Sequence, residues 1–203
     1  AQGATVVMGG LHVTALPDEA LAHCDAVVIG EGEPVWPQVV DDFLRGRLAR
    51  RYSASPAGRF DLAQAPLPRF DLLDPNRYNR ITVQTSRGCP HRCEFCASSI
   101  LLTPAYKLKP IDKVLAEIAA IKRIWPQPFI EFADDNSFVH REHYRALMRA
   151  LAPHRLKWFT ETDVSVAQDA DLLGLMRDAG CQQVLIGLES PTRAGVGRVE
   201  TRA

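Results

Sequence analysis

Apolar strand patterns alternate with amphipathic helix patterns along most of this chain of 203 residues, and no other feature limits its fold as strongly. Strands that alternate with helices favour a parallel sheet whose connections cross over in the right-handed sense. In the longer of two such regions, the strand patterns cover 80–85, 129–133, 156–160 and 183–188, and the helix patterns cover 111–124, 141–151 and 170–179. The sequence therefore predicts an α/β fold, with Gly180 as the stop signal of the last of these helices.

A shorter region of the same kind occupies residues 1–46, which we interpret as part of a doubly wound domain. Its patterns are a β-branched run at 5–8 that ends in Gly9 and Gly10, a helix at 17–23, a strand at 26–29 and a helix at 34–44. The chain begins without a methionine, directly in the pattern of a buried strand. We therefore expect a fragment of a longer protein.

Residues 47–79 lack clear periodicity, and four prolines interrupt them, at positions 56, 66, 68 and 75. Proline removes a backbone donor and ends regular structure. We predict a linker here, between the first region and a second domain at 80–203. Five apolar side chains are expected to fix parts of it to a neighbouring surface: Leu62, Phe70, Leu72, Leu73 and Tyr78.

Three cysteines, Cys89, Cys93 and Cys96, follow the strand pattern at 80–85 in the spacing C-x3-C-x2-C. Functional groups of βα barrels lie at the carboxyl ends of the strands, which is where this loop begins. Iron-sulfur clusters are held by cysteine thiolates, and three thiolates leave one iron of a four-iron cluster open to a small molecule. The sequence therefore predicts an open metal centre.

Two other interpretations of these cysteines fit the residues less well. A structural zinc site needs four ligands, and the nearest fourth candidate, His91, lies inside the same loop. Disulfides are typical of short secreted chains, whereas this chain is long and has five cysteines, an odd number. We therefore expect a reducing compartment, with Cys24 and Cys181 packed as small apolar residues.

The charge balance gives no reason to expect a nucleic-acid or membrane partner. Lys plus Arg and Asp plus Glu both number 24, so the formal net charge is zero. No apolar run approaches the roughly 20 residues needed to span a bilayer, and the N-terminus has no basic stretch followed by an apolar one. We expect a soluble, cytoplasmic protein.

The cysteine motif, with Phe95 before its last cysteine, resembles the signature of the radical S-adenosylmethionine (SAM) superfamily. The resemblance implies a 4Fe-4S cluster on Cys89, Cys93 and Cys96, with SAM bound to the open iron beside Phe95. It further implies reductive cleavage of SAM to a 5'-deoxyadenosyl radical, with the electron supplied by a donor such as flavodoxin or ferredoxin. The implied fold is an open, TIM-like (βα)6 barrel, of which 80–203 would form the first half.

Polar residues follow the later strands of this region, where they would reach the same mouth. They are Asp134, Asp135 and Asn136 after the second strand, Glu161, Thr162 and Asp163 after the third, and Glu189 and Ser190 after the fourth. Many superfamily members carry Gly-Gly-Glu-Pro after the second strand, to contact the amine of SAM. Two interpretations stay open for the residues present here: they bind the amine and ribose of SAM, or they cap the following helices.

Three sequence segments resemble the cobalamin-dependent branch of the superfamily: Arg87-Gly88-Cys89-Pro90, Phe132-x-Asp134-Asp135-x-x-Phe138 and Gly187-Leu188-Glu189-Ser190. Residues 1–46 resemble the C-terminal part of the Rossmann-like cobalamin-binding domain that precedes the barrel in this branch. That resemblance implies that Gly9 and Gly10 let the backbone approach the nucleotide tail of cobalamin. The D-x-H-x-x-G motif that supplies an axial histidine does not occur in this sequence.

Together these features predict a radical SAM enzyme that works with cobalamin on a small-molecule or natural-product substrate. The reaction would be methylation, or a cyclisation or rearrangement, at an unactivated carbon. A radical SAM methylthiotransferase or other RNA-modifying enzyme is the first alternative. The second is a module that binds an iron-sulfur cluster or zinc without catalysis.

Overall fold

The computed structural model describes residues 3–54, 60–96, 105–188 and 199–201 of the chain. The chain folds into two compact units, Ala1–Ala65 and Pro66–Ala203. Each unit has a parallel sheet with helices between its strands, so the predicted α/β class with parallel sheets is confirmed. No helix in the described part of the chain is both long and apolar enough to cross a bilayer.

The first unit contains a sheet of three parallel strands in the order β1, β2, β3. Its elements are β1 (Val7–Met8), α1 (Leu11–Ala15), α2 (Pro17–Leu21), β2 (Ala26–Ile29), α3 (Trp36–Leu44) and β3 (Arg51–Ser53). Alternate residues of the central strand β2 belong to two different apolar clusters. Val28 packs with Val39 of α3, whereas Val27 packs with Val13 of α1. The central strand is therefore covered by apolar side chains on both faces.

Strand β3 lies inside the stretch predicted as a linker at 47–79, where no sequence pattern indicated a strand. Only one of its side chains, Tyr52, is buried, and its hydroxyl donates to Asp42 Oδ2 at 3.1 Å. A three-residue edge strand with one apolar side chain has no period-2 pattern to recognise. Pairing with β2 makes it a strand, which is a tertiary effect.

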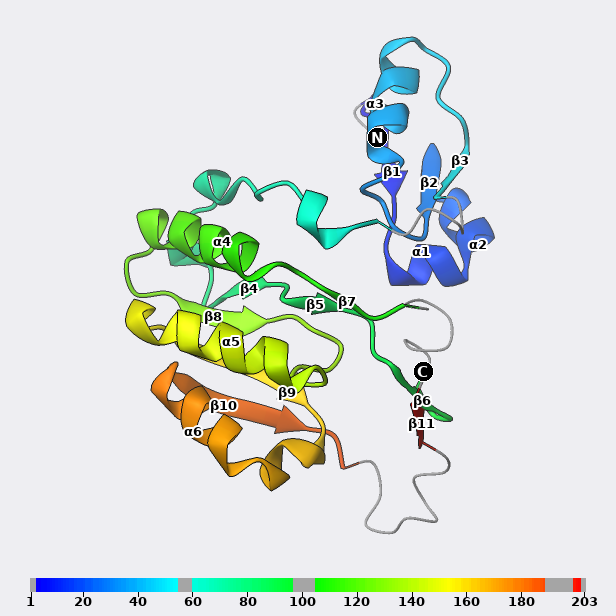
Figure 1. Ribbon diagram of the computed structural model, residues 1–203. Coiled ribbons are helices and arrows are strands. Elements are labelled where there is room, and N and C mark those ends of the chain that lie inside the picture. The colour runs from blue at the N-terminus through cyan, green and yellow to red at the C-terminus, as the bar shows by residue number, and fades with distance from the viewer. Residues whose placement is uncertain (1–2, 55–59, 97–104, 189–198, 202–203) are drawn as a thin grey trace. The chain divides into compact units, whose positions relative to one another are not determined.

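The second unit is built on four parallel strands in the order β4, β8, β9, β10. These strands are β4 (Ile81–Val83), β8 (Phe129–Phe132), β9 (Lys157–Thr162) and β10 (Cys181–Ile186), with helices α4 (Ile111–Ile124), α5 (Arg141–Leu151) and α6 (Ala170–Asp178) between them. All four strands and all three helices occur where the sequence predicted them. Figure 1 shows the three helices on one face of the sheet.

The strand register separates the sheet into a buried face and an exposed face. Ile81, Ile130 and Trp158 lie side by side across three strands, are at most 5% exposed and form part of the main core under the helices. On the other face, Thr82 pairs with Glu131, and Glu161 pairs with Leu185. Thr82, Glu161 and Leu185 are exposed. This alternation is typical of a sheet covered by helices on one side.

The segment between β4 and α4 adds two short antiparallel pairs around the cysteines. β5 (Ser86–Arg87) pairs with β7 (Lys107–Leu108), and β6 (His91–Cys93) pairs with β11 (Val199–Thr201). The sequence predicted neither pair. Each strand has only two or three residues, which is too short for a periodic signal.

Short 3-10 helices occur in the connections of the described residues. They are η1 (Leu62–Gln64), η2 (Phe70–Leu72), η3 (Pro75–Arg77), η5 (Ala152–His154) and η6 (Val164–Gln168). Phe70 of η2 is buried in the main core, and Leu73 packs against that core. The expectation that apolar side chains fix this stretch is confirmed for Phe70 and Leu73, and Leu62 is buried as well. It is wrong for Leu72 and Tyr78, which are 73% and 49% exposed.

Candidate functional site

A buried carboxylate, Asp134, lies shortly after β8 and holds the start of the cysteine loop. Its Oδ1 accepts hydrogen bonds from the backbone amides of Thr85 at 2.7 Å and Ser86 at 2.8 Å. Its Oδ2 accepts from the hydroxyls of Thr85, Ser137 and Tyr144, the last two at 3.0 and 3.1 Å. Burial raises the pKa of Asp134, although the bonds from Thr85 and Ser86 act in the opposite direction. Asp134 therefore fastens the end of β4 to the end of β8.

Sequence reasoning missed the partners of Asp134, and Tyr144 in particular. Tyr144 is fully buried on α5, where its hydroxyl oxygen also lies 3.0 Å from Ser86 Oγ. Burial, and then the charge of Asp134, raises its pKa well above the ordinary value, so the phenol keeps its proton as a donor. In the sequence Tyr144 is one more apolar position of an amphipathic helix. Only the packing of α5 reveals its polar role.

The neighbouring acid, Asp135, is exposed and reaches a later point of the loop. Its Oδ2 accepts a hydrogen bond from the backbone amide of Gly88 at 2.7 Å. Gly88 has a φ of 81°, in the left-handed region that favours glycine, and it immediately precedes the first cysteine. The two acids after β8 therefore fix the backbone at Thr85, Ser86 and Gly88, just before Cys89.

The backbone that follows these acids is itself held in an uncommon conformation. Phe138, in the connection between β8 and α5, has a φ of 69°. Its ring is 1% exposed and packs against Tyr144 at 4.9 Å and Trp158 at 6.4 Å between centroids. A positive φ is rare for a bulky residue and persists only where the surroundings fix it. The aromatic contacts supply that restraint.

The third polar residue after β8, Asn136, is 7% exposed and links the loop to the end of β9. Its Nδ2 donates to Asp163 Oδ2 at 2.9 Å and lies 3.8 Å from Cys89 Sγ. Its Oδ1 accepts from the backbone amide of Asp163 at 3.2 Å. Burial would raise the pKa of Asp163, but hydrogen bonds from Ser165 and Asn136 outweigh it, so this pKa is lowered.

The three thiols of the loop are half-buried, and none forms a disulfide. The backbone amide of Cys96 donates to the carbonyl of Cys93 at 3.0 Å, which places these two cysteines on one turn. Burial is the main cause that raises the pKa of Cys89. Within the described ranges, no three metal-binding side chains are gathered as a preformed cage. The donor set nevertheless fits an iron-sulfur cluster, because three partly exposed thiols share one short loop with a hydrogen-bond donor beside the first.

The other residues predicted at this mouth have mixed environments. Phe95 is 51% exposed in the cysteine loop. His91 Nε2 lies 3.7 Å from Asp163 Oδ2. Thr162 is buried and donates to the carbonyl of Ser137 at 2.6 Å. Glu161 is exposed near the end of β9, whereas Glu189 and Ser190 lie outside the described residues.

The two remaining cysteines have local partners that agree with packing roles. Cys24 Sγ lies 3.2 Å from the carbonyls of Ala20 and Ala26. Cys181 packs against the main core, and burial raises its pKa from 9.0 to about 11. A thiol with so high a pKa is a poor nucleophile at neutral pH.

Four glycines line a hollow of about 150 Å³ at the carboxyl ends of β1 and β2 in the first unit. They are Gly9, Gly10, Gly30 and Gly32, and Trp36 completes the lining at the start of α3. A Cβ on Gly9 would meet only Val28, at the ordinary contact distance of 3.6 Å, and its φ is not positive. Neither strain nor packing therefore requires a glycine at position 9. Its effect is to leave room in the hollow.

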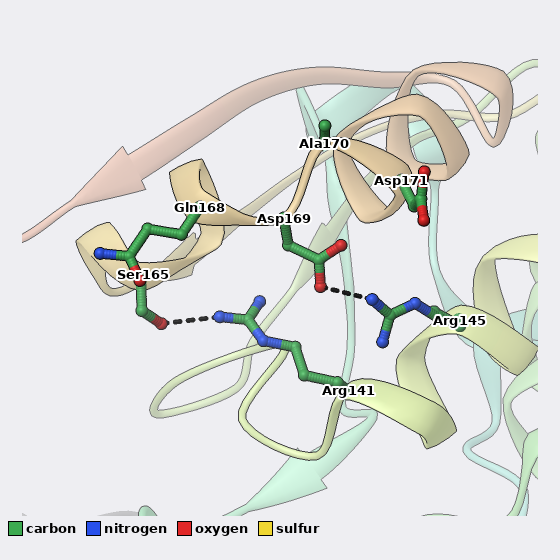
Figure 2. Close-up of a pocket in the computed structure, with 7 residues that line it drawn as sticks. All are labelled: Arg141, Arg145, Ser165, Gln168, Asp169, Ala170 and Asp171. Atoms are coloured by element: carbon green, nitrogen blue, oxygen red, sulfur yellow. Dashed lines mark hydrogen bonds and ion pairs between the residues drawn. The ribbon is translucent and has the colours of Figure 1, made fainter.

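A larger hollow, of about 490 Å³, lies beside α5 and α6 and contains none of the predicted site residues. Figure 2 shows that two arginines of α5 reach across it: Arg141 donates to Ser165 Oγ at 2.7 Å, and Arg145 pairs with Asp169 Oδ2 at 2.6 Å. Asp169 also caps α6 by accepting from the amide of Leu172. These links fasten α5 to the start of α6, which is a structural role.

Comparison with known proteins identifies the family. Residues 83–202, more than half of the chain, match the model of the radical SAM superfamily. The chain therefore belongs to the radical SAM superfamily of enzymes, and the resemblance seen in the cysteine motif is confirmed.

The similar curated proteins include methyltransferases. The chain is 30% identical over 195 residues to bacteriochlorophyllide d C-12(1)-methyltransferase from Chlorobaculum tepidum, a match that covers 94% of this chain and 43% of that protein. It is 26% identical over 198 residues to hopanoid C-2 methylase from Rhodopseudomonas palustris, a match that covers 92% of this chain and 37% of that protein. The chain thus spans less than half the length of these relatives.

Among solved structures, the fold resembles TsrM from Kitasatospora setae, a radical SAM methyltransferase determined with cobalamin and a 4Fe-4S cluster bound. The TM-score is 0.72 at 18% identity, with 92% of this chain and 42% of TsrM covered. At this identity the likeness establishes the shared fold.

Proposed function

We propose that the protein is a radical SAM methyltransferase that uses a 4Fe-4S cluster and cobalamin to methylate an unactivated carbon of a small molecule. One observation carries the proposal: three thiols, none in a disulfide, lie in a loop that Asp134 and Asp135 fasten to the carboxyl end of β4. The family match, over residues 83–202, covers this loop and the strands that follow it.

In this proposal Cys89, Cys93 and Cys96 hold the cluster as thiolates, and the fourth iron is left for SAM. Binding the metal releases the thiol protons. Burial raises the pKa of Cys89, so this thiol keeps its proton more strongly than an exposed cysteine would. When bound, the cluster supplies the electron that cleaves SAM reductively, and cobalamin supplies a carrier for the methyl group. The chain's own contribution is to fix the loop and to bind the two organic cofactors.

For SAM, the exposed acid Asp135 is the best placed of the three candidates after β8. Asp134 is buried and accepts five hydrogen bonds from the chain itself, so its oxygens face inward. Asp135 is exposed in the same segment, next to Gly88. A carboxylate there would attract the ammonium of SAM. Glu189 and Ser190, which follow β10 in the sequence, stay predicted contacts of the same cofactor.

For the substrate, the exposed face of the sheet is the surface that a barrel would enclose. We propose that β4, β8, β9 and β10 are the first four strands of an open (βα)6 barrel, with helices outside and this face inside. Its exposed side chains include Thr82, Glu161 and Leu185. Polar and apolar groups together suit a substrate that is largely carbon and hydrogen with a few polar handles.

We assign cobalamin to the glycine-lined hollow of the first unit. In this proposal the first unit is the C-terminal part of a cobalamin-binding domain. Gly9 and Gly10 lie there at the carboxyl end of β1, where ligands of doubly wound sheets bind. The missing side chain of Gly9 leaves space that the protein does not fill. The residues therefore fit a bulky ligand that approaches the backbone closely.

Methyl transfer is favoured over cyclisation because both curated relatives described above are named for methylation. RNA modification is not supported by the charge balance, since basic and acidic residues number 24 each. The expected electron donor, a flavodoxin or ferredoxin, is a separate protein that a chemical reductant can replace in a first assay.

Anaerobic reconstitution with iron and sulfide tests the cluster. The wild-type chain should bind about four irons, and SAM should alter the electron paramagnetic resonance spectrum of the reduced cluster. Replacing Cys89, Cys93 or Cys96 with Ala should abolish cleavage of SAM to 5'-deoxyadenosine, whereas Cys24→Ser and Cys181→Ser should keep the iron. One tightly bound zinc and no iron, or a spectrum that ignores SAM, would contradict the proposal.

A substitution in the glycine-lined hollow tests the cobalamin site. Gly9→Leu should weaken hydroxocobalamin binding by at least about tenfold, because its side chain would occupy the hollow, an expected loss of about 1.4 kcal/mol in binding energy. Equilibrium dialysis followed by absorbance measures the affinity. The control is Gly174→Ala, a substitution in α6. Gly46→Leu is unsuitable as a control because Gly46 has a φ of 67°, at which a side chain strains the backbone. Equal affinities for Gly9→Leu and wild type would remove the assignment.

A further inference from the structure

Asn136 is buried, and both ends of its side-chain amide form hydrogen bonds within the chain. It is 7% exposed, and each end of its amide faces a group of the chain. The carbonyl oxygen Oδ1 accepts from the amide of Asp163 at 3.2 Å, and the hydroxyl of Thr162 lies at the same distance. These contacts fix which end of the amide is oxygen, so the Nδ2 end must point the other way.

The Nδ2 group has two hydrogens, and two acceptors lie near it. One is Asp163 Oδ2 at 2.9 Å, and the other is Cys89 Sγ at 3.8 Å, which is within the range of a hydrogen bond to sulfur. Asp163 is held in turn by the backbone amide of Ser165 at 2.8 Å. The end of β9 therefore aims the Asn136 amide at the first cysteine of the loop.

We infer that Asn136 is a positioning residue for the cluster: its side-chain amide donates to the Cys89 sulfur and holds this thiolate in place. The inference rests on the proposed function, because it assumes that Cys89 binds iron. It gives Asn136 a different role from the predicted contact with SAM. Hydrogen bonds to ligating groups and to the sulfurs of a cluster orient the ligands and tune the reduction potential of a metal centre.

The direction of the effect follows from electrostatics. A cluster gains negative charge when it is reduced, and an N–H donor at a sulfur ligand stabilises that charge. Removing the donor should make the reduced state less stable, so the midpoint potential of the cluster should become more negative. A residue that only filled space would leave this potential unchanged.

The test is a redox titration of the anaerobically reconstituted chain, read by electron paramagnetic resonance. Asn136→Leu removes the donor while keeping the side-chain size, and Asn136→Asp replaces it with a second carboxylate beside Asp163. Both should shift the midpoint potential to more negative values, and the aspartate variant should shift it further. Asn79→Leu makes the same chemical change at an exposed site and should leave the potential unchanged.

Thermal melting monitored by circular dichroism separates misfolding from the intended effect. If both Asn136 variants fail to fold, Thr162→Val is the second test. It keeps the Asn136 side chain but removes the hydroxyl next to Asn136 Oδ1. The midpoint potential should then shift in the same direction by a smaller amount. Loss of iron from a variant that melts like wild type also supports the positioning role. Wild-type iron content and an unchanged potential in folded Asn136→Leu and Asn136→Asp would overturn the inference. Failure of the wild-type chain to bind iron would instead overturn the proposed function.

Discussion

Asp134 and Asp135 are neighbours in the sequence and have the same side chain, yet their surroundings differ sharply. Asp134 is 5% exposed and is surrounded by two amides and three hydroxyls, while Asp135 is exposed and accepts from Gly88. The buried acid therefore has a structural role in placing the cysteine loop. The exposed one is the better candidate for a cofactor contact.

Asp134→Asn should destabilise the chain by about 2 kcal/mol, because the amide places donors opposite the hydroxyls that now donate to Oδ2. Urea denaturation followed by circular dichroism measures the free energy of unfolding. Asp178→Asn is the matched control, since that carboxylate is 57% exposed beside Arg177 and should contribute little. A stability equal to that of wild type in Asp134→Asn would show that the network is not formed.

At the scale of elements, the junction between α6 and β10 shows how one glycine can meet two requirements. Gly180 follows the helix with a φ of 92°, as a helix stop signal requires. It also lies against the start of β9, where a Cβ would be 1.9 Å from the carbonyl oxygen of Leu156. The helix stop was predictable from the sequence. The close approach of Gly180 to the start of β9 was not, because β9 comes before α6 in the chain.

Two glycine substitutions in this region should have opposite effects on stability. Gly180→Ala should cost about 3 kcal/mol or more, because its Cβ collides with backbone and its φ is unfavourable for alanine. Gly174→Ala should stabilise the chain by about 0.5–1 kcal/mol, because Gly174 is inside α6 and nothing lies within 4 Å of its Cβ position. Thermal unfolding of both variants measures the difference. Equal melting temperatures would contradict the backbone contact.

At the scale of the whole molecule, the fold and the cysteine loop are held by different interactions. The main apolar core joins all three helices of the second unit to its four-stranded sheet. None of Cys89, Cys93 and Cys96 belongs to that core in the described part of the chain. Hydrophobic burial of this extent is the dominant stabilising term in folding. We therefore expect the domain to form without the metal.

Removal of iron should accordingly leave the fold intact. Chelation of the reconstituted protein under anaerobic conditions should abolish its visible absorbance without changing the far-ultraviolet circular dichroism or the cooperativity of unfolding. This outcome differs from that of small zinc modules, which unfold without their metal. A loss of helical signal on chelation would show that the cluster is part of the core of the structure.

The sequence by itself determined the α/β class, the place of each helix and long strand in the second unit, and the three candidate cluster ligands. These features are local: apolar periodicity along a strand or helix, and the spacing of thiols within one loop. The tertiary structure decided what depends on distant contacts. Strand β3 exists because β2 pairs with it, and Asp134, Asn136 and Tyr144 acquire their roles because the ends of β4, β8 and β9 meet. A hydrogen bond between residues far apart in the chain leaves no periodic trace, so only the folded arrangement could reveal it.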